Sequence, residues 1–268
     1  MADESDAHRD VEDVPSQGGS GMHIHQPKPA SSVREFLSEI AVIAVGIAIA
    51  LSGEQVLEAL HWRHQTEAAE VALHHEISDD LTNAEERLML AQCAEERIKT
   101  LSDALRGPAG PWRGDAIEPG EVNHAVLPQV YAMRYRPWLR GAWDTAAVSN
   151  TVDHFPRDRL AFYVNAYRLI DALQDVQNRE LDVRSQLQPL AYDQDLDRSQ
   201  RLAFEKDLAE LDNWSRLGML ASQSLIENIK RSDVRSQIRP DNSFLAEQLL
   251  TFRRELGACA RPPDATLD

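Results

Sequence analysis

The sequence predicts an all-α protein, in which an N-terminal transmembrane helix is continuous with a long helix of an antiparallel helical bundle. Three observations support this fold class. The only long apolar run lies near the N-terminus, at residues 36–53. After it, apolar residues recur every three or four positions, which is the period of a helix face. No segment shows the sustained alternation of apolar and polar residues that is typical of a half-buried strand.

The charge of the chain argues against two classes of partner. Its 268 residues carry a formal net charge of −16 at pH 7. Nucleic-acid binding depends on clustered Lys and Arg, so nucleic acid is not an expected partner. The same charge opposes docking of the soluble part on anionic lipid. Residues 1–32 are rich in Asp, Glu, Ser, Gly and Pro, and we expect this N-terminal tail to be disordered.

Residues 33–55 are predicted to form a transmembrane anchor. As a helix, the run 36–53 would reach about 27 Å, close to the roughly 30 Å of a hydrocarbon layer. A core helix of a soluble bundle normally keeps a polar face, and this run has none. A cleaved signal peptide fits poorly, because the run starts far from the N-terminus and no suitable cleavage site follows it.

The orientation of the anchor is predicted from the basic residues at its two ends. Lys28 and Arg34 precede the apolar run, whereas only Arg63 follows it closely. Because Lys and Arg favour the cytoplasmic side, we expect the N-terminus in the cytoplasm and the bulk of the chain outside it.

Small residues line one side of the anchor. Gly46, Ala50 and Gly53 are spaced so that a second transmembrane helix could approach closely. This pattern favours a homo-oligomer or a contact with another membrane protein. The alternative explanation is that Gly and Ala are simply common in anchors.

The helical pattern continues from the anchor without a proline until Pro108. Two interleaved rows of apolar residues predict a bundle-type core face up to Leu105. The acidic residues between these rows are expected to face outward. They are Glu76, Asp79, Asp80, Glu85, Glu86, Glu95 and Glu96.

The remaining helices are predicted from apolar spacing and from the positions of Gly and Pro. Residues 107–120 are rich in Gly and Pro and are predicted to form a loop. Pro156 suits the first turn of a helix, Pro189 should kink or end that helix, and Gly257 should close the last one. We expect an extracytoplasmic helical domain over 56–258 and a C-terminal tail over 259–268. The predicted helices cover 33–105, 121–134, 137–149, 156–192 and 243–256, together with one that begins at Asp195 or Asp197 and reaches about residue 232.

Two stretches of the chain resemble a bacterial family of single-pass membrane proteins whose domain has no assigned activity. One runs from Glu39-Ile40 through residues 47–51 to Gln55, and the other includes Trp143-Asp144-Thr145 and the aromatic residues that follow. The likeness covers residues 34–90 and 138–180; residues 52–54 depart from the family pattern. The resemblance implies an anchor, a helical extracytoplasmic domain and a bacterial inner membrane, with the domain in the periplasm.

Two Glu-x-x-His pairs are the strongest metal-binding candidates. In Glu58/His61 and Glu121/His124 the spacing places both side chains on one helix face, as in carboxylate-bridged di-iron bundles. Such sites also need a glutamate from each of two further helices. Because Glu is abundant in this chain, we interpret the pairs as coincidental and expect no metal and no cofactor.

The two cysteines, Cys93 and Cys259, are predicted to form a disulfide. Both follow the anchor, so the predicted topology places them in an oxidising compartment, where thiols tend to pair. Only one intramolecular pairing is possible. The alternative is two unrelated cysteines, one buried and one exposed.

The expected function is that of a membrane-anchored, non-enzymatic helical domain for partner binding or envelope scaffolding. The sequence contains no serine nucleophile elbow, phosphate loop or zinc-type cysteine pair. The first alternative is a periplasmic ligand- or pH-sensing helical bundle that signals through a partner membrane protein. The second is a carboxylate–histidine metalloenzyme.

Overall fold

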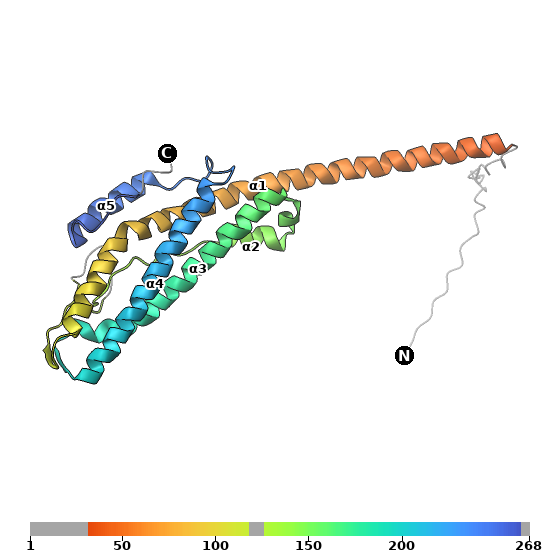
Figure 1. Ribbon diagram of the computed structural model, residues 1–268. Helices are drawn as coiled ribbons and strands as arrows, with labels where there is room; N and C mark the ends of the chain where they lie inside the picture. Colours follow the sequence, from red (N-terminus) through yellow and green to blue (C-terminus); the bar gives the residue numbers. More distant parts are fainter. Residues whose placement is uncertain (1–31, 118–125, 264–268) are drawn as a thin grey trace, which may run out of the picture. The chain divides into compact units, whose positions relative to one another are not determined.

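The computed structural model describes residues 32–117 and 126–263, and it has the predicted all-α fold (Figure 1). The described residues fall into two compact units, which are divided between Val56 and Leu57. A single helix, α1, belongs to both units. The helices are α1 (Val33–Leu105), α2 (Gly141–Val148), α3 (Arg157–Leu187), α4 (Arg198–Lys230) and α5 (Asn242–Leu256). Short 3-10 helices cover Thr151–His154 and Gln188–Ala191. The two short strands are β1 (Gly110–Trp112) and β2 (Gln194–Leu196).

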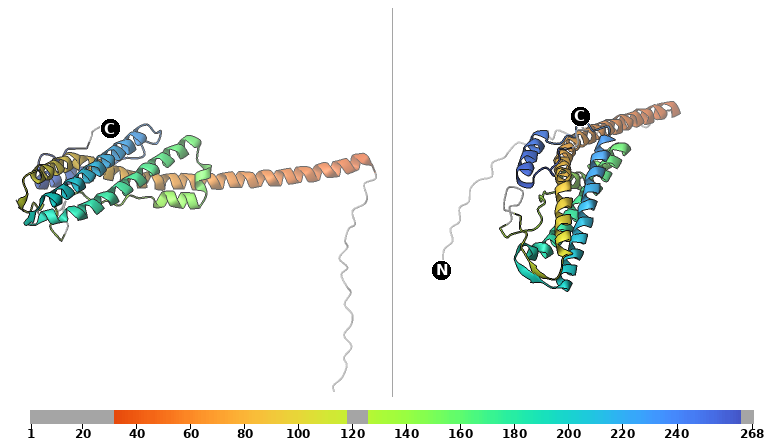
Figure 2. Two further views of the ribbon diagram at one scale, coloured as in Figure 1. Left: turned by 60° about the horizontal axis from the view of Figure 1, so that its bottom comes forward. Right: turned by 60° about the vertical axis from the view of Figure 1, so that its left-hand side comes forward.

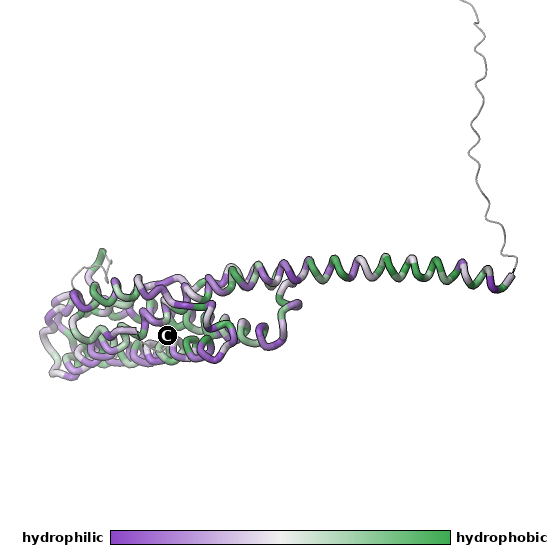
Figure 3. The backbone as a smooth tube through the Cα atoms, turned by 90° about the horizontal axis from the view of Figure 1, so that it is seen from above, coloured by the Kyte–Doolittle hydropathy of each residue, from purple (hydrophilic) through white to green (hydrophobic). Residues whose placement is uncertain are grey.

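The first unit contains the predicted anchor as a regular stretch of α1. Its apolar side chains are exposed on all sides; Val42 is 73% exposed and Ile49 is 68% exposed. Figure 3 shows the hydrophobic colour along this N-terminal stretch of α1. α1 is therefore long and apolar enough to cross a membrane, with none of the apolar window buried in the protein.

The second unit is a bundle in which α4 runs antiparallel to α3 and to α1 (Figure 2). Asn165 near the start of α3 bonds to Asn228 near the end of α4, at 2.8 Å. The chain between α1 and α3 crosses back along the bundle, so that α3 runs parallel to α1. Accordingly, α1 bonds to α3 first at His74–Tyr163 and later at Arg87–Glu180.

Two apolar clusters form the core of this unit. One lies around Leu73, Ile77 and Leu81 of α1, where Tyr163, Ile170 and other residues of α3 and α4 pack against it. The second lies around Met89, Leu101 and Leu105 of α1 and includes Leu208 of α4 and Phe252 of α5. The predicted core face of α1 thus contacts every long helix of the unit.

The helix ends follow local sequence signals. Asp197 and Gln200 form a capping box at the start of α4, with Gln200 N–H donating to Asp197 Oδ1 at 2.8 Å and Asp197 N–H donating to Gln200 Oε1 at 2.9 Å. Asp241 caps α5 through the Phe244 N–H at 2.9 Å. Gly257 ends α5 with a φ of +87°, a conformation that glycine adopts without strain.

The connection between α1 and α3 differs from the prediction. Of the predicted helix 121–134, residues 126–134 are described, and they are not helical; the predicted helix 137–149 begins only at Gly141. In this stretch, Arg97 donates to the Val130 carbonyl at 2.6 Å and Arg184 to the Met133 carbonyl at 3.3 Å. Side chains from distant helices therefore bind carbonyls that a local helix would have used itself.

The predicted exposure of the acidic residues of α1 is wrong for four of them. Glu76, Asp80, Glu85 and Glu86 are buried, whereas Asp79, Glu95 and Glu96 are exposed as expected. From Asp80 to Leu90, α1 passes between α3, α4 and the 126–140 stretch, and no residue of this part of the helix is exposed.

Candidate functional site

Polar residues on one side of α1, all buried except the half-buried Asn83, form the candidate site. We call this set the polar seam: Glu76, Asp80, Asn83, Glu86 and Arg87. Asp80 lies four residues after Glu76, Asn83 lies three after Asp80, and the neighbours Glu86 and Arg87 lie three and four after Asn83, which places the set along one side of the helix. They contact α3 and the stretch from Arg136 to Trp143, and each contact below lies within the second unit.

Glu76 caps the short helix α2 from outside its own segment. The N-cap residue of α2, Arg140, makes no side-chain capping bond. Instead, the Glu76 carboxylate accepts from the Ala142 N–H at 2.8 Å and from the Trp143 N–H at 3.4 Å. The Tyr167 hydroxyl also donates to it, at 2.6 Å. A buried carboxylate thus satisfies the N–H groups that every helix start leaves unpaired.

Asp80 is fully buried and only half satisfied. Its Oδ1 accepts from the Leu139 N–H at 2.9 Å, while Oδ2 has no hydrogen-bond partner among the described residues. The pKa of Asp80 is raised to about 8, mainly by burial; the Leu139 N–H lowers it in part, and the negative charges of Glu76 and Asp79 add to the rise. Asp80 is therefore mainly protonated at neutral pH and titrates just above it.

Two further members of the seam hold the chain at Arg136 and Pro137. Glu86 accepts two hydrogen bonds from the Arg136 guanidinium, at 2.6 and 2.8 Å, and this pairing raises the pKa of Arg136. Asn83 donates to the Pro137 carbonyl at 3.1 Å. From α3, the Gln177 side chain donates to the Arg136 carbonyl at 2.8 Å.

Arg87 completes the seam by pairing with Glu180 of α3. Both side chains are buried, so the pair is shielded from water and salt. Gly218 of α4 lies directly against the Arg87 guanidinium, and a Cβ at that position would collide with it. The absence of a side chain at 218 is therefore what allows the pair to lie between the helices.

A second polar group lies one to two turns before the seam. The buried His74 ring shares a 2.8 Å hydrogen bond with the Tyr163 hydroxyl, and burial lowers the pKa of His74. Beside it, Arg159 bonds to Glu70 at 2.7 Å and to Asp233 at 3.1 Å. These contacts join α1, α3 and the loop after α4 at one end of the bundle.

The polar seam is arranged to hold residues 136–143 against α1 rather than to act as a catalytic centre. Its carboxylates bind N–H groups, a hydroxyl or guanidinium groups of the protein itself. The cavity bounded by Asn83, Glu86 and Arg136 measures about 10 Å³, which is the room of a single water molecule. The chemical event that the arrangement supports is the gain or loss of a proton at Asp80.

The structure describes two of the four candidate metal ligands, Glu58 and His61. Glu58 accepts from the Trp62 ring at 3.5 Å, and His61 faces Gln65 at 3.3 Å; both are exposed on α1. Glu121 and His124 lie outside the described residues. Within residues 32–117 and 126–263, no group of three or more His, Cys, Asp or Glu side chains could hold a metal ion.

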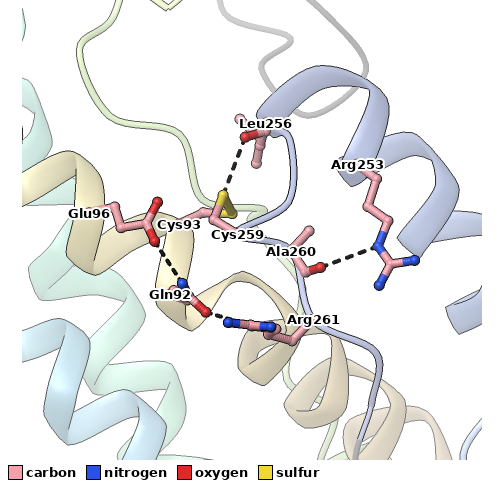
Figure 4. Close-up of a disulfide and its surroundings, with 8 residues drawn as sticks. All are labelled: Gln92, Cys93, Glu96, Arg253, Leu256, Cys259, Ala260 and Arg261. Atoms are coloured by element: carbon pink, nitrogen blue, oxygen red, sulfur yellow. Dashed lines mark hydrogen bonds between the residues drawn. A yellow bond between two sulfur atoms is a disulfide. The ribbon is translucent and has the colours of Figure 1, made fainter.

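Cys93 of α1 and Cys259 after α5 are bonded to each other in the structure, with a Cα–Cα distance of 4.9 Å (Figure 4). Next to the bond, the Arg261 N–H donates to the Met89 carbonyl at 3.0 Å and its side chain to Gln92 at 2.5 Å. Ala260 is fully buried. The segment that follows α5 is thus held against α1, where the sequence predicts the start of a C-terminal tail.

The predicted anchor-packing residues, Gly46, Ala50 and Gly53, are exposed on α1. A Cβ added at Gly46 or Gly53 would meet no atom within 4 Å. Packing within the described chain therefore does not require a glycine at either position.

Sequence reasoning missed the seam and its partners Arg136, Tyr167 and Glu180. One signal was available: the polar residues at 76, 80, 83, 86 and 87 keep helical spacing beside the apolar rows. In a helix that is enclosed on all sides, such a row must be buried and paired.

Comparisons with protein-family models, with curated proteins and with solved structures give no match for this chain.

Proposed function

We propose that the chain is a membrane-anchored, non-enzymatic helical domain that binds a partner or scaffolds the cell envelope. The observation that carries this proposal is the apolar stretch of α1, whose side chains are exposed on all sides. Contact of such an apolar surface with water is unfavourable along every turn of the helix. The same surface is solvated without this penalty by the hydrocarbon layer of a membrane.

The bundle supports the non-enzymatic part of the proposal. Its buried acids and arginines bind one another or the protein backbone, as Glu76 and Glu86 do. A domain built in this way presents a fixed surface. The resemblance to bacterial single-pass proteins supports an inner-membrane location, and the basic residues Lys28 and Arg34 before the anchor support a cytoplasmic N-terminus with the bundle in the periplasm.

A reporter on the intact chain tests the topology. Alkaline phosphatase fused after Asp268 should be active, and a reporter that works only in the cytoplasm should stay inactive at the same position. In the control variant, Ala44→Arg with Ile47→Arg, each arginine costs about 2.5–3.5 kcal/mol of insertion free energy. That variant should lose membrane association. The opposite reporter pattern would contradict the orientation.

Crosslinking tests the partner-binding role. The full-length protein, carrying a photoreactive residue at an exposed bundle position such as Leu202 or Leu220, should yield a discrete adduct in cells. The adduct should disappear in the Ala44→Arg, Ile47→Arg variant. If no exposed position of the bundle gives an adduct above the level of this control, partner binding by the bundle is wrong.

One observation favours a second candidate, a pH-sensing bundle that signals through a partner membrane protein. Asp80 titrates near neutral pH and bonds to the backbone at Leu139, directly before α2. Its ionisation would place an unpaired charge between α1 and the chain that leads into α2. Urea unfolding of the natural chain and of Asp80→Asn at pH 5 and pH 8.5 measures this effect, and equal pH dependence in the two proteins would contradict the pH-sensing role.

A further inference from the structure

A cleft of about 490 Å³ lies where α1 ends and α4 begins. We call it the Arg201 cleft; it is lined by Ala104, residues 107–115 and Arg201. Its loop wall is fixed in place, because β1 pairs with β2 and the Asp115 N–H donates to the Leu190 carbonyl at 3.1 Å. At Gly114 a Cβ would meet the backbone of Ala191 at 2.5 Å, so the loop packs directly on the turn that precedes β2.

Arg201, in the first turn of α4, is 7% exposed. Its guanidinium donates to the Ala104 carbonyl at 3.3 Å and to the Gly110 carbonyl at 3.2 Å. Its Nε has no hydrogen-bond partner among the described residues. The guanidinium carbon lies 5.9 Å from the centre of the Trp112 ring. None of the carboxylates in the described part of the chain pairs with Arg201.

This environment leaves a positive charge incompletely compensated. An arginine stays protonated in proteins, and a buried charge is costly unless it is paired. The Ala104 carbonyl lies at the end of α1, so one donor of Arg201 caps that helix, and the Gly110 carbonyl in β1 accepts from another donor. The two carbonyls do not supply the negative charge that a buried guanidinium needs.

The other charged groups at the cleft leave room for an anion. Arg113 lines the cleft, is exposed and forms no ion pair within the described residues. The acid that lines the cleft, Asp115, pairs with Arg97 at 3.0 Å. Among the residues that line the cleft, the charges without a charged partner in the described part of the chain are therefore those of Arg113 and Arg201, in a protein whose net charge is −16.

We propose that the Arg201 cleft binds a small oxyanion, a carboxylate or a phosphate group, between the buried guanidinium of Arg201 and the guanidinium of Arg113. The planar fork of an arginine matches the oxygen atoms of both groups, which makes such pairs shorter and stronger than neutral hydrogen bonds. The volume of the cleft is in the range of sites that hold small molecules. This site is independent of the function proposed above.

Titration calorimetry of the full chain in a nonionic detergent tests the site. Sodium phosphate and sodium succinate serve as probes, with sodium chloride at equal ionic strength as the reference. Saturable heat with phosphate or with succinate, absent with chloride, is the expected result. The probe that binds more tightly identifies the group that the cleft prefers. No saturable heat with either probe, or the same heat with chloride, would overturn the proposal.

Variants locate the binding. Arg113→Gln removes an exposed charge at the rim and should raise the dissociation constant about tenfold. Arg198→Gln, on the same turn of α4 but outside the cleft, is the matched control and should bind as the natural chain does. Arg201→Lys keeps the charge but loses the fork and should weaken binding further. If the Arg201 variant does not fold, the Arg113 and Arg198 pair decides, and equal binding by those two variants would refute the site.

Discussion

Replacing Asp80 by asparagine should remove a pH dependence from the stability of the bundle. Asp80 is fully buried, its pKa is raised to about 8, and its Oδ2 has no partner. Asparagine has the same shape as the protonated acid and keeps an oxygen for the Leu139 N–H. It cannot ionise, so the variant stays in the state that the folded protein prefers.

The direction in which pH changes the stability follows from the direction of the pKa shift of Asp80. The pKa of Asp80 is near 3.8 when unfolded and about 8 when folded, so the unfolded chain releases this proton first. The stability that Asp80 contributes is complete below pH 3.8 and is lost as the pH rises to 8. A shift of this size corresponds to about 5–6 kcal/mol. We expect about 2–4 kcal/mol, because the chain around Leu139 relaxes and admits water.

Urea unfolding of the full chain in detergent, at pH 5 and pH 8.5, measures the effect. About two thirds of the linkage falls between these pH values, so there the natural chain should lose about 1.5–3 kcal/mol more stability than Asp80→Asn does. His74 shifts the natural chain in the opposite direction, because its lowered pKa favours folding at high pH. Since both proteins contain His74, most of its contribution cancels in the difference.

Asp79→Asn is the matched control, because Asp79 is the exposed neighbour of Asp80 on α1. The Asp79→Asn variant should keep nearly the same pH dependence of stability as the natural chain. A small difference is expected, because the Asp79 charge contributes to the raised pKa of Asp80. The charged and titratable groups that face Asp80 are Glu76 and Asp79 on α1 and Tyr167 on α3. If Asp80→Asn shows the same pH dependence as the natural chain, or is less stable at pH 8.5, the reasoning about Asp80 is wrong.

Three further predictions concern other parts of the chain. Mass spectrometry of protein made in an oxidising periplasm should find no free thiol at Cys93 or Cys259, and reduction should cost up to about 4–5 kcal/mol of stability; two free thiols would contradict this. Gly218→Ala should lower the free energy of unfolding by about 1–3 kcal/mol, because the new methyl group collides with the Arg87 guanidinium, and an unchanged urea midpoint would refute that collision. Elemental analysis of the purified chain should find less than one iron, manganese or zinc ion per molecule; full occupancy that is lost in Glu58→Ala would support a metalloenzyme instead.

Local physics determined much of the fold from the sequence. The bounds of α1 follow from the apolar rows and from the Gly107-Pro108 breaker, and they match the prediction at both ends. The starts of α4 and α5 follow from Asp197 and Asp241, and the end of α5 follows from Gly257. Each of these signals acts within one or two helical turns, so a reading of the sequence can find it.

The tertiary structure decided the course of the chain between α1 and α3 and the role of the acids on α1. Residues 126–140 have apolar residues that would suit a helix, but their carbonyls bind Arg97 and Arg184 from distant helices. Glu76 and Asp80 look like solvent-facing acids until the 136–143 stretch covers them. The physical reason is the same in both cases. These backbone and carboxylate groups find their hydrogen-bond partners on segments 30 or more residues away in the sequence. Helix propensity and apolar spacing are local, so neither contains that information.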